Sequence, residues 1–555
     1  MASRNKIGDI SYQRPNFKRF VTKRRRLIDR LSNEPSDNTI KLYELWNKLR
    51  DDWDYYLTIT NIGVSAYSDD SFWENELDVL SSYTPEISRL DSEILELFLK
   101  RGRIGHLRKY AGSLAIKRLQ ASCINVEKAA LELSESRSIQ DWIEYRMGLR
   151  LKLGNSYHNV DDLSAMMSSK YRRERKKAYT ALSEYFSDER LDHIMERLVH
   201  VRDEIAKSSD YSNYEELSES ESFRDWGSKE AYVFKENVRK YIVPIVTSIQ
   251  RSAKKRRLNV KKVENWDEYV NWKTGNPSLI IEHDKIQETF INSIGEVYGD
   301  VGATLAKNMK LRGLLDIEDR KNKEPGACCW LIDGTNDSYV MAKLTGDYDD
   351  THTLFHEFGH ALTFYMSGHH IIPELRKASR ELIEIPSMTS ELFANNVLDK
   401  FYGRNSKKIA GQHLAAMLIL MCKVCVIDEW QRNLYRNPFW KKEDRNAAWI
   451  SAEKIWTPWR TPMKNGWKSD WGIFETPFYD LDYAIAAVCS IEIWKDSLDD
   501  MDSGVAKIMR ICELGGTLTF KDAIAKVGIG NPFDSRTMRR IAKFAKTQLE
   551  NCDLL

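Results

Sequence analysis

The stretch T-L-F-H-E-F-G-H-A-L-T at residues 353–363 places His356 and His360 four positions apart, with Glu357 beside the first. On an α-helix, positions i and i+4 share one face, so both imidazoles can grip a single metal ion. Glu357 then projects close to that ion, where a carboxylate can take a proton from a metal-bound water. Apolar neighbours predict that this helix is buried, and a divalent cation would satisfy the polar groups buried with it.

A metal site of this kind needs one more ligand. Catalytic zinc uses three protein ligands and leaves a fourth position open for water. The stretch at residues 381–394 carries three carboxylates that are all plausible on one helix start: Glu381, Glu384 and Glu391. Spacing alone leaves all three open as the third ligand.

Composition bounds the class of protein. The chain has 555 residues, which predicts two lobes or domains rather than one core. Its 84 basic and 82 acidic residues give a net charge of +2, so no overall field favours nucleic acid or an anionic membrane. No uninterrupted apolar run approaches the ~18 residues of a membrane span, and residues 1–30 lack the apolar core of a secretory signal.

The basic cluster at 23–26 is typical of a solvated helix face. The eight cysteines are scattered. Cys422 and Cys425 form a lone C-x-x-C among apolar residues, which indicates helix core rather than a zinc ribbon. We therefore expect free thiols and a cytoplasmic location.

Most of the chain has helical patterning. There is no proline from Glu86 to Val243, which predicts a series of long helices. Residues 170–207 show apolar positions at three- and four-residue steps, with a break near Ser187. The best strand candidates flank the turn-forming residues 333–336 within the stretch 327–344. We expect a hairpin or short sheet there, beside the metal helix, whose edge could pair with an extended peptide.

Two motifs together resemble those of a known family. The metal-helix string, followed by E-I-P-S-M-T-S-E at 384–391, is similar to the thimet oligopeptidase/oligoendopeptidase F family of zinc metallopeptidases. The stretch D-I-E-D-R-K-N-K-E-P-G-A-C at 316–328 resembles a further motif of that family. The likeness runs from about Tyr171 to about Ser497.

The resemblance implies a ligand set and a fold. One Zn²⁺ per chain would be held by His356, His360 and Glu384, with Glu357 as general base and Glu391 orienting a metal-bound histidine. The fold would be mainly α, with two helical lobes enclosing a deep substrate channel and a small β-sheet beside the zinc helix. Residues 1–165 would form the N-terminal helical lobe and residues 166–555 the catalytic domain.

A later segment adds chemistry under the same resemblance. P-F-Y-D-L-D-Y at 477–483 is similar to a family segment whose tyrosine hydroxyls stabilise the oxyanion of the tetrahedral intermediate. Tyr483 is the preferred donor and Tyr479 the second. Family members usually carry a histidine where this chain has Gly472, so either another donor replaces it or turnover is reduced.

The expected activity is zinc-dependent hydrolysis of internal bonds in short unstructured peptides. One alternative is a different helical zinc peptidase that removes terminal residues, such as a dipeptidase or carboxypeptidase. Another is a peptide-binding protein that has lost catalysis, for which Gly472 is the only support. Cleavage preference, the choice between monomer and homodimer, and the preference for zinc over cobalt or manganese stay open.

Overall fold

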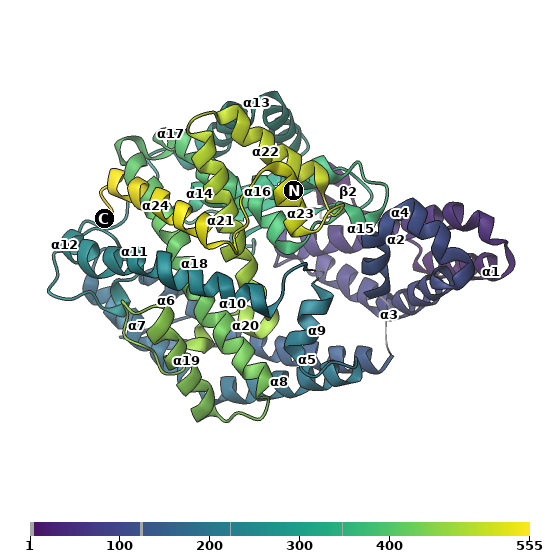
Figure 1. Ribbon diagram of the computed structural model, residues 1–555, viewed down its shortest axis with the longest axis horizontal. Coiled ribbons are helices and arrows are strands. Elements are labelled where there is room, and N and C mark those ends of the chain that lie inside the picture. The colour runs from purple at the N-terminus through teal and green to yellow at the C-terminus, as the bar shows by residue number, and fades with distance from the viewer. Residues whose placement is uncertain (1–4, 122–125, 223, 347) are drawn as a thin grey trace. The chain divides into compact units, whose positions relative to one another are not determined.

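The computed structural model describes residues 5–121, 126–222, 224–346 and 348–555. The chain forms two compact units, each built from three separate segments. Unit 1 comprises Met1–Ile124, Ile280–Phe401 and Asp496–Ile529, and unit 2 comprises Asn125–Leu279, Tyr402–Lys495 and Gly530–Leu555. Both units consist mainly of helices, which confirms the predicted mainly α class (Figure 1).

Unit 1 contains the predicted metal helix and the N-terminal helices. One of its apolar cores lies among α1–α4 and includes Leu42, Tyr43 and Phe98, none of which is exposed. Its helices are α1 Phe17–Asn33, α2 Thr39–Ala66, α3 Ser71–Leu99, α4 Arg101–Ala121, α13 His283–Leu311, α14 Asp350–Ser367, α15 Pro373–Arg376, α16 Arg380–Phe393, α22 Met501–Leu514 and α23 Phe520–Val527. A two-residue hairpin, β1 Lys6–Ile7 and β2 Ile10–Ser11, precedes them, and α17 Asp399–Tyr402 ends the middle segment.

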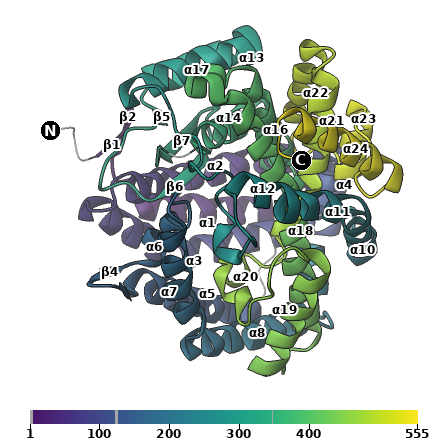
Figure 2. The ribbon, with the colours of Figure 1, turned by 90° about the vertical axis from the view of Figure 1, so that its left-hand side faces the viewer.

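A three-stranded sheet packs against α14 in unit 1 (Figure 2). Its order is β5-β7-β6, with β5 Leu315–Asp316 parallel to β7 Ser338–Lys343 and β6 Gly326–Leu331 antiparallel to β7. The turn between β6 and β7 contains Gly334 at a φ of 73°, a conformation that glycine adopts without strain. The predicted hairpin beside the metal helix is therefore confirmed, and β6 is an edge strand.

Unit 2 is a second helical assembly. Its helices are α5 Val126–Gly148, α6 Val160–Met166, α7 Arg172–Phe186, α8 Glu189–Ser208, α9 Tyr214–Glu221, α10 Ser228–Asn237, α11 Val243–Thr247, α12 Lys254–Leu258, α18 Ser406–Arg436, α19 Lys442–Trp456, α20 Gly472–Glu475, α21 Asp480–Ser497 and α24 Ser535–Asn551. Cys422 and Cys425 are fully buried in α18, as predicted for helix core. The helical pattern at 170–207 is confirmed as α7 and α8, with the break where it was expected.

Two details differ from the sequence-based predictions. The proline-free stretch after Glu86 is interrupted by a hairpin of β3 Leu151–Leu153 and β4 Ser156–His158. Its strands are too short to show alternation, and Gly154, at a φ of 65°, makes the turn. In the basic cluster at 23–26, Arg24 is fully buried and pairs with Asp91 at 2.9 Å, so it is not part of a solvated face.

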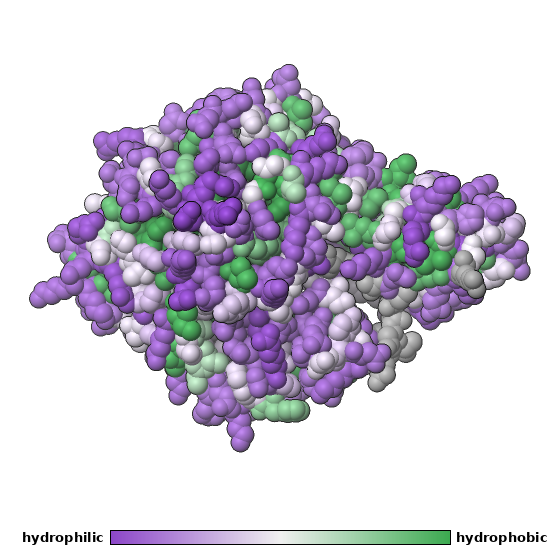
Figure 3. All heavy atoms as spheres, viewed as in Figure 1, coloured by the Kyte–Doolittle hydropathy of each residue, from purple (hydrophilic) through white to green (hydrophobic). Residues whose placement is uncertain are grey.

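One helical stretch that includes α18, Asp399–Arg436, is long and apolar enough on average to cross a membrane. However, 72% of its apolar window is buried inside the protein, and a buried core helix passes the same test. On the face drawn in Figure 3, hydrophilic residues predominate and hydrophobic residues gather in small groups. We therefore assign α18 to the core of unit 2.

Candidate metal centre

The predicted metal site begins with the close approach of α14 and α16 in unit 1. Gly359 makes that approach possible, because a Cβ there would lie 2.5 Å from the Cα of Ser387 and 2.9 Å from the carbonyl oxygen of Pro386. Any larger residue would push the two helices apart. The glycine between the two histidines thus brings α16 and its carboxylates against the histidine face of α14.

Three side chains then converge. The Nε2 atoms of His356 and His360 lie 3.1 Å apart. Glu384 Oε2 lies 3.4 Å from the first and 3.7 Å from the second. Tetrahedral zinc with bonds of about 2.0–2.2 Å separates its ligand atoms by about 3.3–3.6 Å. The two imidazole nitrogens and the carboxylate oxygen therefore have both the chemistry and the spacing that a zinc ion requires.

The outer nitrogens of both imidazoles are held by α16. Glu391 Oε1 lies 2.5 Å from His356 Nδ1, and Ser387 Oγ lies 2.9 Å from His360 Nδ1. Such contacts fix the ring orientation and leave the Nε2 atoms aimed at a common point. Sequence reasoning anticipated a role of this kind for Glu391 and missed Ser387, which lies one helical turn after Glu384 and so on the same face.

The charges around the histidines affect their protonation. Burial acts to lower the pKa of His356, but the hydrogen bond and charge of Glu391 raise it to about 9. Burial and the neighbouring His356 hold the pKa of His360 well below its ordinary value. Because only the neutral ring can ligate, a metal ion and a proton compete for His356.

Glu357 lies on the face of α14 next to the metal-binding face and is only 7% exposed. Burial, together with the charges of Glu384 and Glu391, raises its pKa to about 7, although the charge of His356 opposes this. Burial raises the pKa of Cys328 on β6, and the charge of Glu357 raises it further. A carboxyl group with a pKa near neutrality can both accept and return a proton.

The three carboxylates that spacing left open have different places. Glu384 contributes an oxygen to the group formed with the two histidines, whose ligand atoms all lie within 4.8 Å of one another. Glu391 contacts the far nitrogen of His356 instead. Glu381 is fully buried one turn before Glu384 and contributes no atom to that group.

Tyr479 and Tyr483 belong to unit 2, where they form a pair at the start of α21. The Tyr483 hydroxyl donates to that of Tyr479 at 3.3 Å, and their rings meet edge to face at 5.1 Å. The two hydroxyl groups therefore lie side by side, on residues that are about one helical turn apart in the sequence.

The position of Gly472, where the family resemblance led us to expect a histidine, is close to two carboxyl groups. A Cβ on Gly472 would lie 3.2 Å from Asp470 Oδ1 and 3.3 Å from Asp480 Oδ2. Burial raises the pKa of both aspartates, and the charge of Asp470 raises that of Asp480 further. A side chain at position 472 would press on this pair, so glycine and the two acids fit together.

Replacing Asp480 with asparagine should stabilise the protein increasingly as the pH rises. The pKa of Asp480 is raised well above its ordinary 3.8, so the folded protein keeps a proton that the unfolded chain releases. The stability due to that proton is complete below the ordinary pKa and is lost as the pH rises through the raised one. In thermal unfolding, the gain in Tm for D480N over wild type should grow from about pH 5 to about pH 8. A gain that shrinks over this range would contradict the raised pKa.

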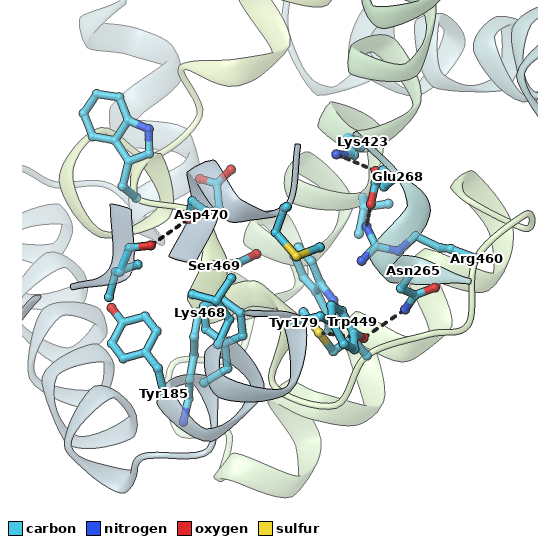
Figure 4. A pocket seen from close by; sticks show the side chains of 18 of the residues that line it. Tyr179, Tyr185, Asn265, Glu268, Lys423, Trp449, Arg460, Lys468, Ser469 and Asp470 are labelled. Carbon is cyan, nitrogen blue, oxygen red and sulfur yellow. Dashed lines mark hydrogen bonds and ion pairs between the residues drawn. The ribbon is translucent and has the colours of Figure 1, made fainter. Parts of the chain in front are cut away.

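Unit 2 also holds a pocket with a volume of about 390 Å³. In it, Glu268 lies between Lys423 at 2.7 Å and Arg460 at 3.6 Å (Figure 4). Aromatic rings form much of the remaining wall: Trp142, Tyr179, Tyr185, Tyr269, Trp449 and Trp471. This volume is within the range of about 300–1,000 Å³ that is usual for small-ligand sites. Lys468, Ser469, Asp470 and Trp471 also line the pocket.

Comparisons with known proteins give a family match over most of the chain. The model of peptidase family M3 matches residues 165–543, and that of the peptidase M3 N-terminal domain matches residues 7–123. The comparison with curated proteins gives no match.

Solved structures share the fold. PZ peptidase A, solved with an inhibitor, has 23% sequence identity and a TM-score of 0.90, over 98% of this chain and 99% of its own. A Bacillus anthracis protein assigned as an oligoendopeptidase F has 23% identity and a TM-score of 0.87, over 99% of both chains. At this identity the likeness shows the fold, while the family match extends over most of the sequence, including both histidines, Glu357 and Glu384. The chain therefore belongs to peptidase family M3 and is a metallopeptidase.

Proposed function

We propose that the protein is a zinc-dependent oligoendopeptidase that hydrolyses internal bonds of short, unstructured peptides. The observation that carries the proposal is the convergence of His356, His360 and Glu384, with Glu357 beside them. Two imidazoles and one carboxylate are a ligand set of catalytic zinc in peptidases. Such a set leaves one coordination position open for chemistry.

Zinc bound there would act as a Lewis acid and lower the pKa of water toward neutrality. Glu357 takes the proton of the attacking water and returns it to the departing amine. Glu391 and Ser387 keep the imidazoles in place throughout. A phenol hydroxyl is a suitable donor for the oxyanion that forms on the scissile carbonyl, and we assign this role to Tyr483, with Tyr479 as the second donor.

Strand β6 offers a means of binding an extended peptide. It lies at the edge of its sheet and packs against α14, which carries Glu357. A peptide that adds as a further strand would be held through its backbone, whatever its sequence. These features favour unfolded peptides over folded proteins.

Substrate size and cleavage position provide the test. A fluorogenic peptide of about ten residues, blocked at both ends, should be cleaved internally, while casein should be digested slowly or not at all. An exopeptidase would leave the blocked peptide intact, and a binding protein without catalysis would leave every peptide intact. Mass spectrometry of the products identifies the bond, and efficient casein digestion would contradict the size limit.

A further inference from the structure

The tyrosine pair of unit 2 follows a strained residue. Phe478 has a φ of 65°, in the left-handed region that aromatic residues rarely adopt. This conformation is unfavourable and persists only where surrounding contacts impose it. It directly precedes Tyr479 and the first turn of α21. The strain therefore lies at the bend that sets the direction of both tyrosines.

Buried polar side chains hold both backbone groups of Phe478. The backbone N–H donates to Gln431 Oε1 at 2.8 Å, and the carbonyl accepts from Arg224 Nη2 at 2.8 Å. The ring is fixed as well, since it packs on Tyr435 at 5.5 Å and beneath the Arg432 guanidinium at 5.7 Å. These contacts stabilise the left-handed conformation.

Arg224 also reaches the residue before the second tyrosine. The same Nη2 atom donates to Asp482 Oδ2 at 2.6 Å, and both side chains are almost completely buried, 2% and 0% exposed. Phe478 immediately precedes Tyr479, and Asp482 immediately precedes Tyr483. One guanidinium nitrogen thus ties together the residues that come before each tyrosine. Its planar group stacks on Trp226 at 4.4 Å, which limits how far it can move.

A second buried arginine holds the chain just upstream. Arg202 is fully buried and donates to the carbonyls of Ile473 at 3.4 Å and Phe474 at 2.5 Å. Its own position is fixed by Glu135 at 2.6 Å and by the Tyr435 hydroxyl at 2.8 Å. The turn from Phe474 to Phe478 is therefore held by a buried arginine at each end, Arg202 at Phe474 and Arg224 at Phe478.

We propose that Arg224 is a positioning residue for peptide hydrolysis, which aims the Tyr479–Tyr483 pair by bridging the Phe478 carbonyl and Asp482. The inference rests on the proposed function of the tyrosines as oxyanion donors. Arg224 donates to the Phe478 carbonyl and to Asp482, so its effect on turnover passes through the backbone and that carboxylate. Lysine cannot replace it, because an ammonium lacks the rigid plane that stacks on Trp226 while donating to two acceptors.

The test uses R224K with R175K as a matched control. Arg175 is a buried arginine of unit 2 that pairs with buried Asp267 at 2.7 Å, and its side chain is 3% exposed. The structure gives its hydrogen bonds to residues 169–170 and 266–267. R224K should lower kcat by about 10- to 100-fold, the effect of a small displacement of catalytic groups, with little change in KM. Zinc content should be unchanged, and R175K should keep kcat within about twofold of wild type. The isosteric Q431M, which removes the acceptor of the Phe478 N–H, should lower kcat in the same way.

The decisive measurement is the same substitution in a Y479F/Y483F background. If Arg224 acts through the phenols, R224K there should cost less than about twofold further, because non-additivity marks residues that act as one unit. An equal loss in both backgrounds would overturn the proposal. If the tyrosine variants lose activity but R224K does not, this inference alone fails. If Y479F/Y483F keeps full kcat, the oxyanion role fails and the inference fails with it.

A spectroscopic measurement tests the position of the Tyr483 phenol independently of turnover. With 3-fluorotyrosine placed at position 483, the ¹⁹F resonance should shift in R224K and stay in place in R175K, in the absence of substrate. An unchanged resonance in R224K would show that Arg224 does not set the surroundings of the phenol, and would overturn the proposal.

Discussion

Replacing Glu357 with glutamine should abolish nearly all peptide hydrolysis while leaving zinc bound. Glutamine has almost the same shape but can neither accept the proton of water nor return it to the leaving amine. Loss of a general base typically costs about 10²–10⁴ in rate. Because Glu357 contributes no atom to the ligand group, the metal content should stay near one per chain. Steady-state assays with the blocked peptide and elemental analysis of the same sample check both halves.

Turnover and zinc content of E357Q together distinguish two ways in which the role assigned to Glu357 could be wrong. Near-normal turnover in E357Q would remove Glu357 from the base role, even if zinc is retained. Loss of zinc together with activity would mean that Glu357 supports the ligands instead. The buried carboxyl also contributes to the raised pKa of Cys328, so this shift should weaken in E357Q, as thiol alkylation at increasing pH can measure in the metal-free protein.

The sequence predicted elements whose periodicity is long and regular. The metal helix, α7, α8 and the β6–β7 hairpin all have such patterns or clear turn residues. The β3–β4 hairpin was missed because strands of three residues carry no measurable alternation. Arg24 was misplaced because burial of an arginine depends on a partner, Asp91, that lies far away in sequence. Local patterns cannot report a pairing of that kind.

The candidate site likewise contains features that local sequence predicts and features that depend on tertiary packing. The spacing of His356 and His360 is local and could be predicted from the helix alone. The choice among three carboxylates could not, because it depends on how α16 packs, and that packing follows from the absence of a side chain at Gly359. The contacts of Arg224 were also beyond sequence reasoning, because Phe478 and Asp482 lie over 250 residues away along the chain.

The surroundings of Gly472 change how the missing family histidine is understood. Sequence alone left two options, reduced turnover or a substitute donor. The structure places the carboxyl groups of Asp470 and Asp480 about the glycine, and burial favours the protonated form of each. A protonated carboxyl is a hydrogen-bond donor, as an imidazolium is. Position 472 is therefore bordered by two polar carboxyl groups, although no histidine stands there.

Replacing Glu384 with alanine should remove the metal and, with it, all activity. Two imidazoles alone bind zinc far more weakly than two imidazoles and a carboxylate, and the loss should exceed the roughly 10- to 100-fold that follows from loss of a ligand's hydrogen-bond partner. E391Q provides that comparison, since Glu391 contacts the outer nitrogen of His356 and contributes no atom to the ligand group. E381Q is the matched control for a buried carboxylate on the same helix. Zinc titration against a competing chelator should rank affinity as wild type and E381Q, then E391Q, then E384A. Full zinc occupancy in E384A, or loss of zinc in E381Q, would show that a carboxylate other than Glu384 is the third ligand.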